Sequence, residues 1–172
     1  MVSNFFKDLE KAKIGEAIVL NVLQHATDDY EFTDVSDKRE CYYKGDIEVY
    51  DKWWNAHYFI DVKMDGCIGR TGNILCEEKV YFYDSGYRSG NMLSSYDYLA
   101  IISVDTQNIY IIDFNKLKKH YRIGKRYSKD HGEQITYGYL FSLDKAWKLG
   151  MIEAVIKYEE REDGYYPINV AV

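Results

Sequence analysis

The sequence contains little proline and little cysteine, and it has no long apolar run. A single proline among 172 residues argues against proline-rich linkers and a disordered chain. Cys41, Cys67 and Cys76 are an odd number without C-x-x-C spacing, which argues against a disulfide framework and a cysteine-ligated zinc site. No stretch approaches the roughly 18 apolar residues that a membrane span needs, and residues 1–4 do not open a signal peptide. We expect a cytoplasmic protein with no membrane partner.

The remaining composition is typical of one globular domain. Hydrophobic residues make up 47% of the chain, which is enough to fill a single core. The four histidines are scattered and form no metal-binding motif. We expect one domain over residues 1–172, with a core over about 5–115 and an elaboration over about 116–172.

Charge is unevenly distributed along the chain. The formal net charge is −6, whereas proteins that bind nucleic acid usually carry a basic surface. Between residues 116 and 129, however, every charged residue is basic. The candidates for contacts with a phosphate backbone are Lys116, Lys118, Lys119, Arg122, Lys125, Arg126 and Lys129. A solvated helix face followed by a loop is the alternative interpretation of this stretch.

Residues 4–25 are predicted to form the first helix. Its apolar residues recur at helical spacing and predict a buried stripe formed by Leu9, Ala12, Leu20 and Leu23. Glu16 falls on the same stripe, where an unpaired carboxylate is costly. Gly15 costs about 1 kcal/mol of helix propensity relative to Ala, but it would let the helix approach a sheet closely. The alternative for Glu16 is a side chain at the helix edge that reaches solvent.

Alternating strands follow this helix. Residues 41–51 and 57–64 are predicted to be two strands joined by a hairpin over 52–56. Trp53 and Trp54 lie near the hairpin tip, where packing is favoured over stacking on bases.

The rest of the chain alternates between strands and short helices. Further predicted strands are 73–83, 98–104, 109–114 and 134–141; short helices are predicted over 115–121 and 143–149, and a loop over 86–95. This order predicts an α+β fold in which a mixed central sheet packs on helices, with a C-terminal strand and helix added to it.

The two predicted strands of the first hairpin carry charged residues on the face opposite their apolar residues. Alternation places Asp61 and Lys63 on one face of the second strand, and it places Asp46 and Glu48 together on the first. A short hairpin can therefore bring Asp46 and Asp61 within reach of one cation. Two close carboxylates raise each other's pKa unless a cation neutralises them, and an oxygen-rich site of this kind suits Mg²⁺ or Mn²⁺.

Such a site has the parts that phosphodiester hydrolysis needs. A bound metal ion lowers the pKa of water and positions it for attack on phosphorus. Lys63 can orient that water and offset the charge that develops on the phosphate. Glu16 can complete the site from the helix.

These residues resemble the PD-(D/E)XK nuclease superfamily, whose fold is restriction-endonuclease-like. Gly45–Asp46 matches the "PD" element, with glycine in place of proline, and Asp61-Val62-Lys63 matches the (D/E)XK element. Glu16 is similar to the additional helix acid of the branch that contains Holliday-junction resolvases and phage-type exonucleases. The segment 69–74, soon followed by Glu77, is similar to small members from phages or mobile elements.

The resemblance implies an αβββαβ core and metal-dependent hydrolysis of DNA. It implies that Asp46, Asp61, Glu16 and the backbone carbonyl of Val62 ligate Mg²⁺ or Mn²⁺, and that Lys63 is catalytic. Resolvases and restriction enzymes of this type cut two strands as homodimers. Arg70, Thr71 and Asn73 are further candidates for phosphate contacts, and turn formation explains them equally well.

Two other functional classes are compatible with the sequence. One is a nucleic-acid-binding module that has kept the fold and lost catalysis, which the intact Asp46, Asp61 and Lys63 argue against. The other is a protein-interaction domain, for which the acidic net charge and the many tyrosines are suitable.

Overall fold

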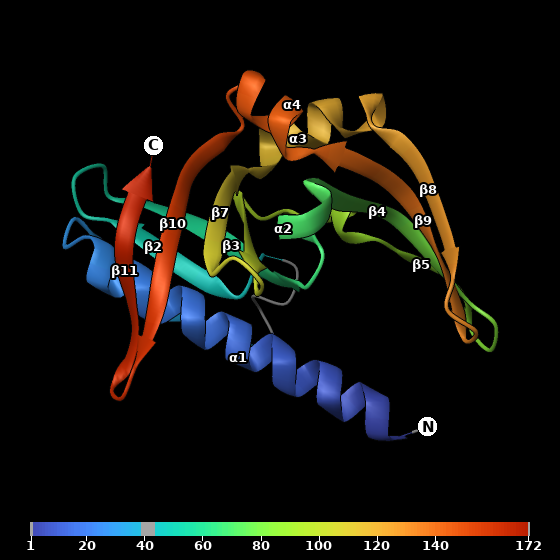
Figure 1. Cartoon of the computed structure of the whole chain (residues 1–172), viewed down its shortest axis with the longest axis horizontal. Helices are drawn as coiled ribbons and strands as arrows, with labels where there is room; N and C mark the ends of the chain where they lie inside the picture. Colours follow the sequence, from blue (N-terminus) through green and yellow to red (C-terminus); the bar gives the residue numbers. More distant parts are fainter. Residues whose placement is uncertain (1, 39–43, 172) are drawn as a thin grey trace.

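One long helix and two curved sheets make up the fold, which confirms the predicted α+β class (Figure 1). The computed structural model describes the backbone of residues 2–38 and 44–171, with side chains from Leu9 onward. Helix α1 (Val2–Ala26) crosses one face of the larger sheet. That sheet has seven strands in the spatial order β1 (Tyr30–Asp34), β2 (Ile47–Asp51), β3 (Ala56–Asp65), β6 (Tyr98–Ser103), β7 (Asn108–Asp113), β10 (Ile152–Arg161) and β11 (Gly164–Ala171).

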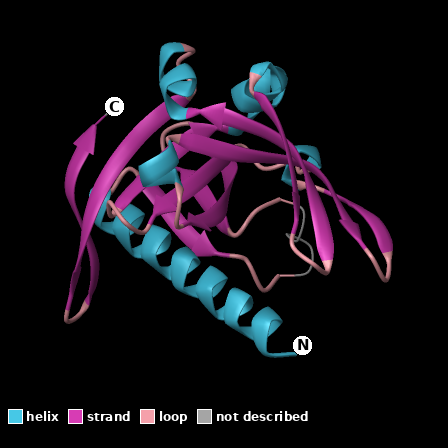
Figure 2. Cartoon of the chain, turned by 45° about the vertical axis from the view of Figure 1, so that its right-hand side comes forward, coloured by secondary structure: helices cyan, strands magenta, loops and turns pink. Residues whose placement is uncertain are grey.

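The smaller sheet arches away from the larger one as an arm (Figures 1 and 2). Its four antiparallel strands have the order β5 (Gly86–Ser89), β4 (Asn73–Phe82), β9 (Gln134–Ser142) and β8 (Lys125–Asp130). Short helical segments lie between the strands: α2 (Ile68–Thr71), η2 (Asn91–Leu93), α3 (Phe114–His120), η3 (Tyr121–Ile123) and α4 (Leu143–Lys148). In the larger sheet, β3 and β6 are the one parallel pair of neighbours in the described part of the chain.

Two apolar clusters lie on opposite faces of the larger sheet. On the helix side, α1 packs on residues that alternate along β2 and β3: Ile47, Val49, Ile60 and Val62. This is the face that the sequence pattern predicts for these four residues. On the other side, β6 and β7 pack on the base of the arm through Leu99, Ile101, Ile112, Phe114, Cys76 and Phe141. A shift of one residue in register would exchange the two faces, so this double burial fixes where Asp61 and Lys63 point.

The buried stripe of α1 lies further toward its C-terminus than predicted. Ile18, Val19, Val22 and Leu23 are buried, whereas Leu9 is 48% exposed and Ala12 is also exposed. The prediction for Leu9 and Ala12 is therefore wrong. The reason is that the first half of α1 extends past the edge of the sheet (Figure 1).

Gly15 confirms the predicted close approach of helix and sheet. A Cβ atom at this position would lie 2.6 Å from Met64 Cγ on β3 and 3.3 Å from Ile102 Cδ1 on β6. Glycine is therefore required by packing, and the same approach buries the neighbouring Glu16 against the sheet.

Several predicted elements need correction. Part of the predicted strand 41–51 lies outside the described residues, and β2 begins at Ile47. The predicted loop 86–95 contains β5 and η2. Trp53 and Trp54 do not pack: they are 80% and 81% exposed at the β2–β3 hairpin.

The C-terminal part contains more strands than predicted. It adds β8 and β9 to the arm and β10 and β11 to the larger sheet, where one strand and one helix were expected. Among the described residues, no helix combines the length and apolar character needed to cross a bilayer.

Candidate active site

The hairpin of β2 and β3 places Asp46 opposite Asp61. Ile47 pairs with Ile60, so the residue before β2 lies beside the residue after Ile60. The backbone N–H of Asp46 donates to the carbonyl of Ile60 at 2.8 Å, and a carboxylate oxygen of Asp46 accepts from the Val62 N–H at 2.8 Å. The first bond holds the Asp46 backbone against β3, and the second holds its side chain there.

The backbone also explains why glycine precedes Asp46. Gly45 has φ +137°, and a Cβ atom here would lie 2.7 Å from the Ile60 carbonyl oxygen. Proline fixes φ near −65°, so it could not adopt this conformation. Glycine at this position therefore follows from the local path of the chain.

The two carboxylates and Lys63 are electrostatically coupled. Burial raises the pKa of Asp46, and the negative charge of Asp61 raises it further. The Lys63 ammonium lies 2.8 Å from Asp61 Oδ2. Desolvation opposes the charge of Lys63, but Asp61, Asp46 and Glu77 together outweigh it and raise the pKa of the ammonium, which stays protonated at neutral pH. The Lys63 side chain is half exposed, so the ammonium can meet a ligand from solvent.

Two buried carboxylate oxygens lack hydrogen-bond donors within the described residues: Asp61 Oδ2 and Glu16 Oε2. Each is instead paired with a lysine ammonium, at 2.8 Å from Lys63 and 3.1 Å from Lys13. These ion pairs offset the cost of burying the two oxygens.

Lys13 connects Glu16 to the strand cluster. Its ammonium contacts Ser36 Oγ at 2.7 Å and Asp37 at 2.8 Å in addition to Glu16. Partial burial opposes the charge, but the contacts with Asp37 and Glu16 raise the pKa of Lys13. The same positive charge acts on Asp46. Glu16 thus belongs to the edge of the cluster and is linked to Asp46 through a lysine that the sequence did not single out.

Two further residues of the site were missed by the sequence analysis. Burial raises the pKa of Glu77 on β4, and the charge of Lys63 acts against that rise. Tyr96 is 2% exposed, and its hydroxyl has no hydrogen-bond partner among the described residues. Burial and the nearby charges of Asp61, Asp46 and Glu77 raise the pKa of this phenol. The sequence pointed to Glu77 only through its place after the segment 69–74, and it gave no role to Tyr96.

The donor set can be compared with the needs of a metal ion. Across the described residues, no three His, Cys, Asp or Glu side chains are grouped so as to hold a metal by themselves. Mg²⁺ usually keeps several waters and takes one or two carboxylates together with substrate phosphate. The Asp46–Asp61 pair, in which each carboxylate raises the local negative charge, suits that kind of ion.

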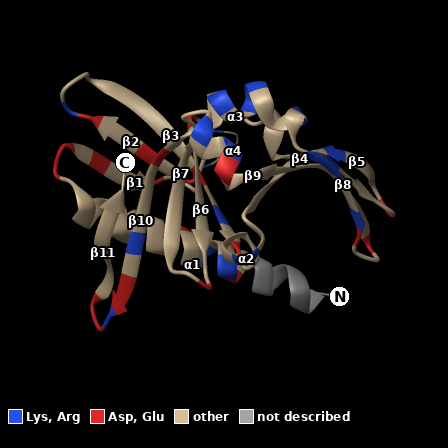
Figure 3. Cartoon of the chain, turned by 45° about the horizontal axis from the view of Figure 1, so that its top comes forward, with Lys and Arg blue, Asp and Glu red and all other residues tan. Residues whose placement is uncertain are grey.

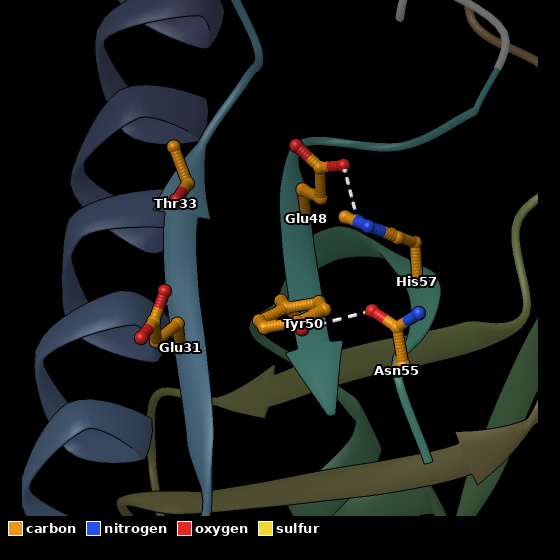
Figure 4. A pocket seen from close by; sticks show the side chains of 6 residues that line it. All are labelled: Glu31, Thr33, Glu48, Tyr50, Asn55 and His57. Carbon is orange, nitrogen blue, oxygen red and sulfur yellow. Dashed lines mark hydrogen bonds and ion pairs between the residues drawn. The ribbon is translucent and has the colours of Figure 1, made fainter. Parts of the chain in front are cut away.

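A hollow lies on the polar face of β1 to β3 (Figure 4). Its volume is about 380 Å³, and its lining residues are Glu31, Thr33, Glu48, Tyr50, Asn55 and His57. His57 Nδ1 lies 2.9 Å from Glu48, and the Tyr50 hydroxyl donates to Asn55 at 2.9 Å. Two carboxylates here disfavour a phosphate backbone, so this hollow is unsuited to that role.

The predicted basic residues divide into paired and unpaired groups. Lys116 lies 2.9 Å from Glu153, Lys118 donates to the Ser94 carbonyl at 2.8 Å, and Arg122 lies 2.8 Å from Glu78. The exposed residues that form no ion pair within the described chain are Lys119, Lys125, Arg126 and Lys129. Three of these four lie on β8, a strand where the alternative interpretation expected a loop, whereas the helix predicted over 115–121 is present as α3.

Thr71 and Asn73, two of the other candidates for phosphate contacts, form hydrogen bonds at the end of the short helix α2. Thr71 Oγ1 accepts from the Asn73 N–H at 3.3 Å, and the Asn73 amide donates to the Thr71 carbonyl at 2.8 Å. Asp65 Oδ1 accepts from Cys67 and Ile68 at the start of the helix. Thr71, Asn73 and Asp65 therefore have local roles in the turn, while Arg70 is exposed to solvent.

Comparisons of the chain with protein-family models, with curated proteins and with solved structures give no match in any of the three.

Proposed function

We propose that this chain is a metal-dependent nuclease of the PD-(D/E)XK type that hydrolyses DNA phosphodiester bonds. The observation that carries the proposal is the pairing of Asp46 with Asp61, beside the Lys63 ammonium. The Lys63 ammonium offsets one negative charge of the pair, but the pKa of Asp46 is still raised, so a further cation would be favoured there. A protein that keeps such a pair needs a compensating role for it, and binding of a cation is the simplest.

The order of elements supports the αβββαβ core that the resemblance implies. Helix α1 is followed by the antiparallel strands β1, β2 and β3, and then by β6, which pairs parallel to β3. The connection from β3 to β6 departs from the simple pattern. It contains the four-residue α2 and two strands of the arm, where the pattern has one full helix.

In this proposal Asp46 and Asp61 hold Mg²⁺ or Mn²⁺, and the carbonyl of Val62 and Glu16 are further ligands. Such an ion supplies Lewis acidity, which polarises a phosphate oxygen and makes water a stronger nucleophile. In the hydrolysis, the water oxygen bonds to phosphorus while the bond to the leaving oxygen breaks, and that oxygen takes a proton.

The residues of the chain then have separate tasks. The Lys63 ammonium lies beside Asp61 and is half exposed, so it can orient the attacking water and offset charge on the phosphate. The backbone of β3 holds the carboxylate of Asp46, which limits its movement during the reaction. Glu77 faces Lys63 from the arm and helps to keep the lysine protonated.

A panel of labelled DNA forms tests this proposal. Linear, single-stranded, nicked and four-way-junction DNA are incubated with the wild type, Lys63→Ala and Lys157→Ala, with Mg²⁺ or Mn²⁺. Lys157 is an exposed strand lysine of the same sheet and serves as the matched control. We expect wild type and Lys157→Ala to cleave at least one form and Lys63→Ala to cleave none while remaining folded. Equal behaviour of all three proteins on every substrate would exclude the nuclease.

A binding module without catalysis gives a different result. It would gain thermal stability from Mg²⁺, because an ion that binds only the folded state stabilises it, but it would cleave no DNA form. A protein-interaction domain with incidental acids would show neither effect.

A further inference from the structure

One face of the arm carries a row of tyrosines and basic side chains, which we call the tyrosine face. It consists of Lys79, Tyr81, Tyr87, Arg126, Tyr137 and Tyr139. Cross-strand register puts these residues side by side: Tyr81 lies opposite Tyr87, Lys79 opposite Tyr137, and Arg126 opposite Tyr139. Residues directly opposite in neighbouring strands share one face of a sheet.

The side chains on this face contact one another. The ring centroids of Tyr81 and Tyr87 are 4.9 Å apart, and those of Tyr87 and Tyr137 are 6.4 Å apart. The Lys79 ammonium lies 4.7 Å from the Tyr87 ring and 5.2 Å from the Tyr137 ring. The rings and the cation therefore form one continuous surface across three strands.

This surface is open to solvent and positively charged. Tyr87 is 61% exposed, and a hollow of about 380 Å³ lies beside it, lined by Lys79, Arg126 and Tyr137 among others. The one acid of the hollow, Glu78, is paired with Arg122 at 2.8 Å and accepts from the Tyr121 hydroxyl at 2.7 Å. Lys79 and Arg126 form no ion pair within the described residues, so their charges are available to a ligand.

We propose that the tyrosine face binds an unpaired nucleic-acid strand, with bases stacked on the tyrosine rings and phosphates near Lys79 and Arg126. Aromatic rings on a sheet, combined with basic side chains, are the general means by which proteins hold single strands. A duplex keeps its bases stacked inside and offers only phosphates, so exposed rings gain little from it. This inference rests on the proposed nuclease function, because it names the form of substrate that the arm presents.

Local charge favours this partner. Lys79 and Arg126 lie on the tyrosine face and form no ion pair among the described residues. With its two hairpin tips, the arm carries five basic and five acidic residues, so the attraction for phosphate is local to these two side chains. Glu77 lies opposite Gly138 on β9, and so it points to the other face of the arm than Tyr81, which lies opposite Ile135.

The test measures binding without cleavage. The anisotropy of a short fluorescein-labelled oligo-dT, and of the same length of duplex, is measured with the full chain in EDTA. Variants are Tyr87→Ala, Tyr87→Phe and Lys79→Ala, and Tyr30→Ala is the matched control, an exposed tyrosine at the edge of the larger sheet. We expect Tyr87→Ala to weaken binding of the single strand about tenfold, Tyr87→Phe to retain it, and the control to leave it unchanged.

Three results would overturn the inference. These are unchanged binding by Tyr87→Ala, equal loss of duplex and single-strand binding, and displacement of the oligonucleotide by poly-glutamate at similar charge concentration. The last result would indicate an acidic protein segment as the partner. Cleavage of the same oligonucleotide by wild type and Tyr87→Ala with Mg²⁺ is measured beside binding, which separates the two proposals. Loss of the inference alone leaves Mg²⁺-dependent cleavage intact, whereas failure of the nuclease appears as absence of cleavage with binding retained.

Discussion

At the scale of single residues, the candidate site is defined by two carboxylates, Asp46 and Asp61, that the fold holds side by side. Asp46 is fixed by the Val62 N–H, and Asp61 lies beside Lys63. The lysine compensates part of the charge, but burial and the charge of Asp61 still raise the pKa of Asp46. The site is therefore expected to cost stability in the absence of a cation.

The pH dependence of stability follows from this pKa. Because the folded state raises the pKa of Asp46, it binds a proton more tightly than the unfolded chain does. The destabilising contribution is complete above the folded pKa and is lost as the pH falls through it. In EDTA, we expect Asp46→Asn to be more stable than wild type at about pH 7.5, with a smaller difference at about pH 5.

Urea unfolding of both proteins at the two pH values measures this difference. The asparagine oxygen can still accept from Val62, so the substitution removes mainly the charge. A difference that stays constant or grows at the lower pH would contradict the raised pKa of Asp46.

At the scale of elements, the sequence predicted those whose apolar residues follow one clear period. These include the β2–β3 hairpin, whose four buried residues alternate, and the β6–β7 pair. Strand β8 was missed because its sequence, Lys-Arg-Tyr-Ser-Lys-Asp, has no apolar alternation, since it lies at the edge of the arm. Strand β11 contains the one proline, Pro167, which lies in an edge strand next to an irregularity of the register.

The same distinction applies to the site. Asp46, Asp61 and Lys63 could be brought together from sequence because they lie on one hairpin. Glu77 and Tyr96 could not, because they reach the cluster through the packing of the arm on the larger sheet. Tyr96 is also one of 18 tyrosines, and nothing in its neighbours marks it.

The contact between α1 and β3 gives a prediction at this scale. In an exposed helix, Gly→Ala gains about 1 kcal/mol, but a Cβ at Gly15 would lie 2.6 Å from Met64 Cγ. We expect Gly15→Ala to lower the free energy of unfolding by about 1–3 kcal/mol instead. Chemical denaturation of Gly15→Ala, Met64→Ala and the double variant measures the coupling between them.

Ala17→Gly, at an exposed position of the same helix, is the matched control and should cost about 1 kcal/mol from propensity alone. A stabilised Gly15→Ala would mean that the helix does not approach the sheet as described.

At the scale of the whole molecule, basic residues mark α3 and the strands of the arm (Figure 3). Acidic residues mark the tip of the β10–β11 hairpin and also the hairpin tips of the arm. An acidic chain can therefore still present a basic surface to a phosphate backbone. The hollow that contains Glu31 and Glu48 lies outside that surface.

The salt dependence of DNA binding distinguishes paired from unpaired lysines. Lys129 is exposed without an ion pair in the described chain, whereas Lys116 is held by Glu153 and Asp113. We expect Lys129→Ala to lower the slope of log Kd against log salt concentration by about 1, and Lys116→Ala to leave the slope unchanged. Titrations in EDTA at several salt concentrations measure both slopes, and equal slopes for the two variants would contradict a phosphate contact at Lys129.

The most direct test of the account is the rate of DNA cleavage against Mg²⁺ concentration for the wild type and Asp61→Asn. The asparagine preserves the shape of the side chain and removes the charge that is proposed to hold the ion. We expect no cleavage in EDTA, a saturable rise with Mg²⁺ for the wild type, and a loss of about a hundredfold or more for Asp61→Asn. Cleavage by Asp61→Asn at the wild-type rate and with the same Mg²⁺ dependence would contradict the assignment of the site.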